Sequence, residues 1–96
     1  MYVLITYDVN TSSAQGAKRL RNVAKCCLDY GQRVQNSVFE CLLSESELLR
    51  LRSRLLTLID TTVDSIRIYK LGKNYQSKIE HLGKQTGFEI EGELII

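Results

Sequence analysis

The segment that most limits the fold of this chain is the run of strand formers at residues 2–8, YVLITYD, which ends on the carboxylate of Asp8. Alternate side chains of a strand point to opposite faces of a sheet. This alternation divides the segment into two sets, namely Val3, Ile5 and Tyr7, and Leu4, Thr6 and Asp8. Both sets are largely apolar, so we expect both faces of this strand to be covered.

A helix follows the strand. The polar loop TSSAQG offers Ser12 or Ser13 as an N-cap, and residues 16–30 carry apolar side chains at helical spacing. This buried stripe consists of Leu20, Val23, Ala24 and Cys27. Gly31 stands where a glycine commonly ends a helix, so the sequence predicts a helix over residues 16–30.

Two short strands and a second helix come next. GQRVQNSVFECLL has β formers on both sides of residues 35–36, which predicts strands at about 32–35 and 37–43 joined by a tight turn. Residues 44–47, SESE, match the S-x-x-E capping box. The helix that they begin is expected to end near residue 60 and to bury Leu48, Leu51, Leu55, Leu58 and Ile59.

The last predicted strand covers residues 63–70 within TVDSIRIYKL, and Gly72 is expected to end it. The remainder is predicted to be mostly loop, with extended pieces at 78–82 and 93–96. The resulting order is β-α-β-β-α-β, the split βαβ or ferredoxin-like arrangement. We therefore expect an α+β fold in which two helices cover one face of a four-stranded antiparallel sheet, followed by an extended C-terminal tail.

The other face of such a sheet needs a cover. About 25 cal/mol is lost for each Å² of apolar surface that stays in water, and a second copy across a two-fold axis is the simplest cover. We expect a homodimer in which the tail, residues 78–96, pairs with the partner subunit. The chain has 96 residues, no proline and no internal repeat, so residues 1–96 are expected to form a single domain.

The cysteine content and the lack of targeting patterns indicate the compartment in which the protein works. The three cysteines, Cys26, Cys27 and Cys41, form neither a disulfide framework nor a zinc motif. The sequence shows no signal-peptide pattern and no apolar run of the roughly 20 residues that a membrane span requires. We expect a reduced, cytoplasmic protein with no membrane partner.

Asp8 supports two interpretations. An aspartate before Val-Asn-Thr-Ser-Ser can cap a turn. Alternatively, its carboxylate can bind Mg²⁺, which prefers oxygen ligands and often takes only one or two carboxylates at nucleotide sites. A dimer axis near the end of the strand would bring two such carboxylates together, and a divalent cation would relieve their repulsion.

Basic side chains are concentrated near the N-terminus. The net charge is +2 overall but +3 over residues 1–35 and −3 over residues 80–96. The predicted first helix carries Lys18, Arg19, Arg21 and Lys25, and Arg33 opens the next strand. Such a run is either a solvated helix face or a phosphate-binding surface. Cations early in a helix oppose its dipole, and a bound anion would offset that cost.

Other residue types favour structural roles. Phe39 is expected in the core, because the motif that exposes aromatic side chains for RNA stacking is absent. His81, the only histidine, is expected to be a hydrogen-bonded structural residue, although it could act as a general base. The cysteines lack a histidine at a recognisable spacing, which argues against nucleophilic catalysis.

Several stretches together resemble one family. LITYDV, KRLRNVAK, GQRVQNSVFEC, DSIRIYKLG and KIEHLG are similar to the small CRISPR-associated adaptation protein, the second universal member of the system and the partner of the CRISPR integrase. The resemblance covers about residues 2–83. The tail FEIEGELII departs from it, because no proline precedes the final apolar residues.

The resemblance implies a ferredoxin-like homodimer in which Asp8 of each subunit binds Mg²⁺, or Mn²⁺, across the dimer axis. It implies metal-dependent endonuclease activity on double-stranded DNA or single-stranded RNA, with Asp8 catalytic, in spacer acquisition and antiviral defence. It also implies that basic residues contact the nucleic acid, and Lys18, Arg19, Arg21 and Arg33 match the family's basic positions. A non-catalytic DNA-binding scaffold for the integrase is the alternative, and an RNA-cleaving toxin on the same fold is a weaker one.

Overall fold

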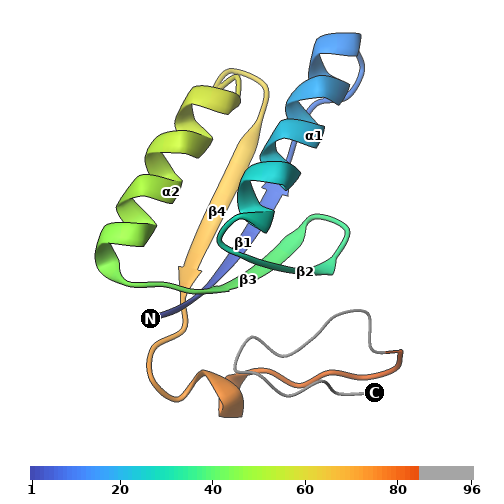
Figure 1. Ribbon diagram of the computed structural model, residues 1–96. Coiled ribbons are helices and arrows are strands. Elements are labelled where there is room, and N and C mark those ends of the chain that lie inside the picture. The colour runs from blue at the N-terminus through green and yellow to red at the C-terminus, as the bar shows by residue number, and fades with distance from the viewer. Residues whose placement is uncertain (85–96) are drawn as a thin grey trace.

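The computed structural model describes residues 1–84 and contains seven elements (Figure 1). In chain order these are β1 (Tyr2–Asp8), α1 (Ala14–Leu28), β2 (Gly31–Gln35), β3 (Val38–Leu42), α2 (Glu45–Leu58), β4 (Ser65–Lys70) and the short 3₁₀ helix η1 (Tyr75–Lys78). The predicted β-α-β-β-α-β order is confirmed. In this part of the chain no helix is long and apolar enough to cross a membrane.

The four strands form one sheet in the order β2-β3-β1-β4, and every neighbouring pair is antiparallel. β1 is central, with Ile5 opposite Phe39 of β3 on one side and opposite Ile68 of β4 on the other. Both helices lie on the same face of this sheet (Figure 1). The architecture is therefore the ferredoxin-like α+β fold.

Side-chain caps determine where both helices begin. Ser13 is the N-cap of α1, and its hydroxyl oxygen accepts a hydrogen bond from the Gly16 N–H at 3.1 Å. Ser44 and Glu47 form a reciprocal capping box at the start of α2, as the SESE motif predicts. The helix α1 begins and ends two residues earlier than the apolar stripe indicated.

Gly31 does not have the predicted role. It begins β2, and among the described glycines only Gly72 and Gly83 have positive φ. A Cβ at Gly31 would lie 2.2 Å from the carbonyl oxygen of Glu40, so glycine is needed because β2 approaches β3 closely. Gly72, at φ +80°, follows the end of β4 as expected.

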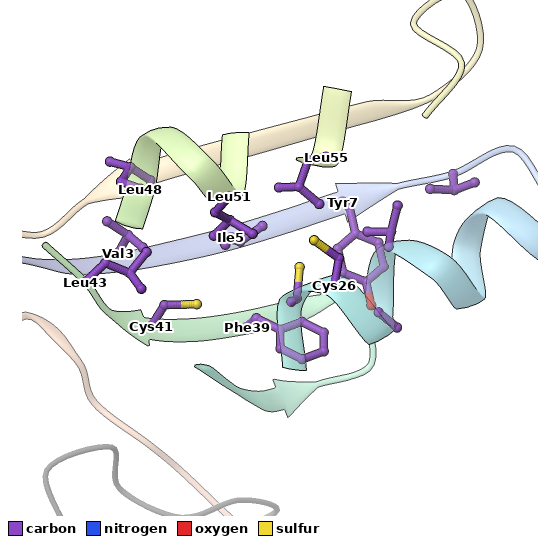
Figure 2. Packing of buried hydrophobic residues seen from close by; sticks show 14 residues of the cluster. Val3, Ile5, Tyr7, Cys26, Phe39, Cys41, Leu43, Leu48, Leu51 and Leu55 are labelled. Carbon is purple, nitrogen blue, oxygen red and sulfur yellow. The ribbon is translucent and has the colours of Figure 1, made fainter. Parts of the chain in front are cut away.

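The core lies between the sheet and the two helices. Val3, Ile5 and Tyr7 point toward α2 and α1, where they meet Leu51 and Cys26 (Figure 2). Phe39 of β3 is fully buried, which confirms its predicted core position. Burying a large apolar side chain of this kind stabilises a fold by about 1.5–3 kcal/mol.

Within residues 1–84, the opposite face of β1 is covered at the start of the strand. The ring of Tyr75 stacks on that of Tyr2 with centroids 3.8 Å apart, and it buries the start of the strand. Further along this face, Leu4 and Thr6 are half-buried and Asp8 is exposed. The described segment after β4 lies near the start of β1 and away from Asp8 (Figure 1).

The tail is only partly described. The 3₁₀ helix η1 ends at Lys78, so the extended piece expected at 78–82 does not begin at residue 78. Ile79 has extended backbone, and residues 79–84 form no paired strand within the described part of the chain. The piece expected at 93–96 lies outside the described residues. Pairing of the tail with a partner subunit stays a prediction.

Candidate metal and nucleic-acid site

Asp8 is the last residue of β1 and stands opposite Ser65, the first residue of β4. Its side chain is exposed, and within residues 1–84 its carboxylate makes no hydrogen bond or ion pair. The turn after β1 is closed by Asn10 instead, whose Oδ1 accepts from Ser12 N–H at 3.0 Å and Ser12 O–H at 2.7 Å. The Asp8 carboxylate is therefore available to an external ligand.

The loop that follows Asp8 is held against the start of α1. A Cβ at Gly16 would lie 1.9 Å from the carbonyl oxygen of Asn10, so only glycine allows this approach. The backbone N–H of Asn10 donates a hydrogen bond to Oδ1 of Asp64 at 3.0 Å. These two contacts fix the backbone directly beyond Asp8.

Asp64 accepts hydrogen bonds from several segments that meet near Asp8. Its side chain is fully buried, and it accepts hydrogen bonds from Arg19 Nε at 2.7 Å and from Asp60 N–H at 2.9 Å, in addition to the bond from Asn10. The Arg19 hydrogen bond lowers the pKa of Asp64 from 3.8 to about 2, although burial opposes the shift. The carboxylate thus stays ionised and joins α1, the loop after β1 and the segment before β4.

The four predicted nucleic-acid-binding residues fall into two groups. Lys18 and Arg21 are exposed on α1, and Arg33 is exposed on β2. Arg19 instead points to Asp64, which raises the pKa of its guanidinium. The structure thus separates a half-buried, paired arginine from three exposed cations.

Arg33 lies beside the residue that precedes Asp8. Its Nη2 is 3.5 Å from the hydroxyl oxygen of Tyr7, and its guanidinium carbon lies 5.2 Å from the centroid of the Phe39 ring. Residues 33–36 line a shallow depression of about 350 Å³. The Tyr7 hydroxyl donates to the Asn36 carbonyl at 3.3 Å, which ties the β2–β3 turn to the end of β1.

The cysteines and His81 are the other side chains of residues 1–84 that could take part in catalysis. Cys26, Cys27 and Cys41 are buried and free, and burial raises the pKa of Cys27 and of Cys41 to about 12. His81 is exposed, with Nε2 2.7 Å from the Lys84 carbonyl oxygen. None of these groups is poised as a nucleophile, since a neutral buried thiol reacts slowly.

The donor set at Asp8 fits Mg²⁺ only in part. A free carboxylate oxygen is the ligand type that Mg²⁺ prefers. Within the described residues, however, no group of three or more His, Cys, Asp or Glu side chains could hold a metal ion. Within residues 1–84, Asp8 is thus not part of a larger cluster of metal-ligating side chains, and a second copy of the chain would add a second carboxylate.

Sequence reasoning missed Asn10 and Asp64. Asn10 carries a local signal, because an asparagine two residues before a serine can close an Asx turn. Asp64 carries none, since its partner Arg19 is 45 residues away in the sequence. A buried carboxylate that accepts from three separate segments becomes visible only in the folded chain.

Comparisons with known proteins agree on one family. The model of the family "CRISPR associated protein Cas2" matches residues 1–79. The chain is 57% identical over 95 residues to the CRISPR-associated endonuclease Cas2 of Halalkalibacterium halodurans, covering 99% of each chain. It is 50% identical over 96 residues to the CRISPR-associated endoribonuclease Cas2 of Chlorobaculum tepidum, covering 100% of each.

Structural similarity supports the same assignment. The crystal structure of Streptococcus pyogenes Cas2 at pH 6.5 superposes with a TM-score of 0.79 at 59% sequence identity, covering 86% of this chain and 100% of that one. The resemblance drawn from LITYDV and GQRVQNSVFEC is thereby confirmed. With its fold, the exposed Asp8 at the end of β1 and these relatives together, the chain belongs to the CRISPR-associated Cas2 family.

Proposed function

We propose that this protein is a metal-dependent endonuclease that cleaves phosphodiester bonds in DNA or RNA during CRISPR spacer acquisition and antiviral defence. Relatives at 57% and 50% identity are named an endonuclease and an endoribonuclease. The observation that carries the proposal is the Asp8 carboxylate, which is exposed and unpaired within residues 1–84, at the end of a central strand. It is available as a Mg²⁺ or Mn²⁺ ligand and as the catalytic carboxylate.

Two copies of the chain complete the site in this proposal. The face of β1 that carries Leu4 and Thr6 is only half-buried, and a second copy placed on it would bring the two Asp8 carboxylates together. Two facing carboxylates repel each other, and a divalent cation between them removes that repulsion. A single chain then needs to supply only one carboxylate, which is compatible with the lack of a larger cluster of metal-ligating side chains in residues 1–84.

The protein's own groups position the substrate. When bound, the metal ion supplies Lewis-acid polarisation of the phosphate and a more acidic water. Lys18, Arg21 and Arg33 are exposed and suited to the phosphate backbone of the nucleic acid. Arg19 uses its Nε and Nη2 N–H groups on Asp64, so we assign it first to holding the loop after Asp8. With one carboxylate per chain, the cleavage rate is expected to be low.

A DNA-binding scaffold for the CRISPR integrase is the second candidate. The sparse donor set favours it, because residues 1–84 contain no cluster of metal-ligating side chains. A scaffold needs the exposed cations but not the Asp8 carboxylate. Removing that negative charge would leave binding intact or strengthen it, since the carboxylate repels phosphate.

The deciding experiment compares wild type with Asp8→Asn on double-stranded DNA and single-stranded RNA, each with Mg²⁺, Mn²⁺ or EDTA. The endonuclease proposal predicts metal-dependent cleavage that the variant loses while it still binds nucleic acid. Equal cleavage by both proteins would exclude Asp8 as the catalytic residue. No cleavage by either, with intact binding, would support the scaffold.

A further inference from the structure

Arg67 of β4 lies on the same face of the sheet as Asp8. In the register of β1 and β4, Asp8 stands opposite Ser65, and Thr6 stands opposite Arg67. Among the strands of residues 1–84, Arg67 is the only lysine or arginine whose register places it on this face. The other strand cations, Arg33 and Lys70, stand opposite Phe39 and Val3 on the core-facing side.

The position of Arg67 is close to that of Asp8. Residues diagonal to each other across an antiparallel pair have Cα atoms about 7–8 Å apart, and Asp8 and Arg67 are such a pair. Arg67 is exposed, and β4 is an edge strand of the sheet that residues 1–84 form. A phosphate beside the Asp8 carboxylate would therefore lie within reach of the long Arg67 side chain.

Within the described part of the chain, no carboxylate pairs with the guanidinium of Arg67. The two ion pairs within residues 1–84 are those of Arg19 with Asp64 and Arg54 with Asp29. Arg67 lies over the ring of Tyr69 instead, with its guanidinium carbon 5.2 Å from the ring centroid. An aromatic ring orients a guanidinium and leaves its N–H groups free for an oxyanion.

Arg19 and Arg67 thus differ in their ion pairing within residues 1–84, since Arg19 has a carboxylate partner and Arg67 has none. Arg19 comes from the basic helix that the sequence pointed to, but a buried carboxylate satisfies it. Arg67 comes from a strand with no neighbouring cation in the segment SIRIY, yet among residues 1–84 no ion pair engages its charge. A planar guanidinium can form two parallel hydrogen bonds with a phosphate group.

We propose that Arg67 binds a backbone phosphate of the nucleic acid next to the phosphodiester that Asp8 cleaves. The inference rests on the proposed endonuclease function for its position in the substrate. In the proposed dimer, the two Arg67 side chains flank the paired Asp8 carboxylates. Arg67 then offsets the repulsion between those carboxylates and the incoming phosphate backbone.

A binding experiment without cleavage isolates this contact. Affinity for labelled duplex DNA is measured in EDTA against salt concentration, for Asp8→Asn alone and with Arg67→Ala, Arg67→Lys or Arg52→Ala. Arg52 is exposed on α2 and serves as the control that removes the same charge elsewhere. Arg67→Ala is expected to reduce the slope of log affinity against log salt by about 0.9 per lost contact. Arg67→Lys should keep most of the slope, and Arg52→Ala all of it.

A cleavage experiment then tests the position of the contact. Arg67→Ala in the otherwise wild-type protein is expected to lower kcat/KM by about 10- to 100-fold, the loss that follows removal of a charged hydrogen bond. The loss should fall mainly on KM, because the contact is with a phosphate that does not react. Arg52→Ala should leave kcat/KM unchanged.

Three outcomes would overturn the inference. An unchanged salt slope with an intact dimer would show that Arg67 does not touch phosphate. Loss of the dimer in Arg67→Ala, measured by light scattering, would show that Arg67 pairs across the interface instead. An equal loss of salt slope in Arg52→Ala would show that the effect of Arg67→Ala comes only from the change in net charge. If neither wild type nor Asp8→Asn cleaves nucleic acid, the endonuclease function fails, and the salt slope still decides whether Arg67 binds phosphate.

Discussion

The Nε atom of Arg19 donates a hydrogen bond to Oδ2 of Asp64 at 2.7 Å, and the same carboxylate accepts from the N–H of Asn10, two residues after Asp8. This pair links α1 to the backbone that carries Asp8. The pair connects the stability of the fold to the geometry of the candidate site, because the loop after Asp8 is hydrogen-bonded to Asp64 through the Asn10 N–H. It also occupies the Nε and Nη2 groups of Arg19, whose binding to nucleic acid stays a prediction.

Replacing Asp64 with asparagine should destabilise the protein and weaken its activity. The variant leaves the half-buried Arg19 without its counter-charge, and a neutral amide accepts the Asn10 and Asp60 N–H bonds less strongly. We expect a lower melting temperature by calorimetry and a lower kcat even where the variant is fully folded. Asp29→Asn, which breaks an exposed ion pair with Arg54, is the matched control and should change little. Equal effects of the two variants would contradict the account.

Stability should depend on pH through Asp64. The pKa of this carboxyl is about 2 in the folded protein against 3.8 ordinarily, so between these values the unfolded chain binds more protons. The stabilisation is therefore complete above about pH 5 and is lost as pH falls toward 2. Urea unfolding from pH 6 to pH 2 should show a steeper loss for wild type than for Asp64→Asn. Parallel curves would show that Asp64 does not titrate as described.

The cysteine thiols should resist modification in the folded protein. Burial raises the pKa of Cys27 and Cys41 to about 12, so almost no thiolate exists near pH 8. A thiol reagent added to native protein at pH 8 should react slowly, and all three thiols should react at once in urea. Fast reaction of the native protein would mean that the core between the sheet and α1 opens readily. With a chromogenic thiol reagent, the rate of absorbance change measures the reaction of the native protein and of the protein in urea.

The sequence was sufficient for the elements and their order, because the signals for them are local. The SESE capping box, the apolar stripe of α2 and the strand formers of β1 all act within a few residues. The placement of Asp8 at a strand end followed from the same pattern. Gly31 was misread because its close approach to Glu40 depends on strand pairing, which no local signal encodes.

The side-chain partners near the site were harder to predict. Arg19 follows the buried Gly16 by three residues and precedes the buried Val23 by four, and this spacing does place it on the inner side of α1. The sequence did not reveal that Asp64 contacts Arg19 there, because the two residues lie 45 positions apart. The sequence also does not show that Arg67 lies near Asp8. That position depends on the register between β1 and β4, which places Arg67 on the same face of the sheet as Asp8.

The most direct test of the central claim is the single-turnover cleavage rate of Asp8→Asn in saturating Mg²⁺, beside wild type and Glu80→Gln. Glu80 is exposed and far along the chain, so its variant controls for the loss of one negative charge. Loss of even an outer-shell metal partner costs about 10- to 100-fold, so removing the ligand itself should leave less than about 1% of the wild-type rate. The Glu80→Gln rate should match wild type. An Asp8→Asn protein that folds, binds nucleic acid and cleaves at the wild-type rate would contradict the account.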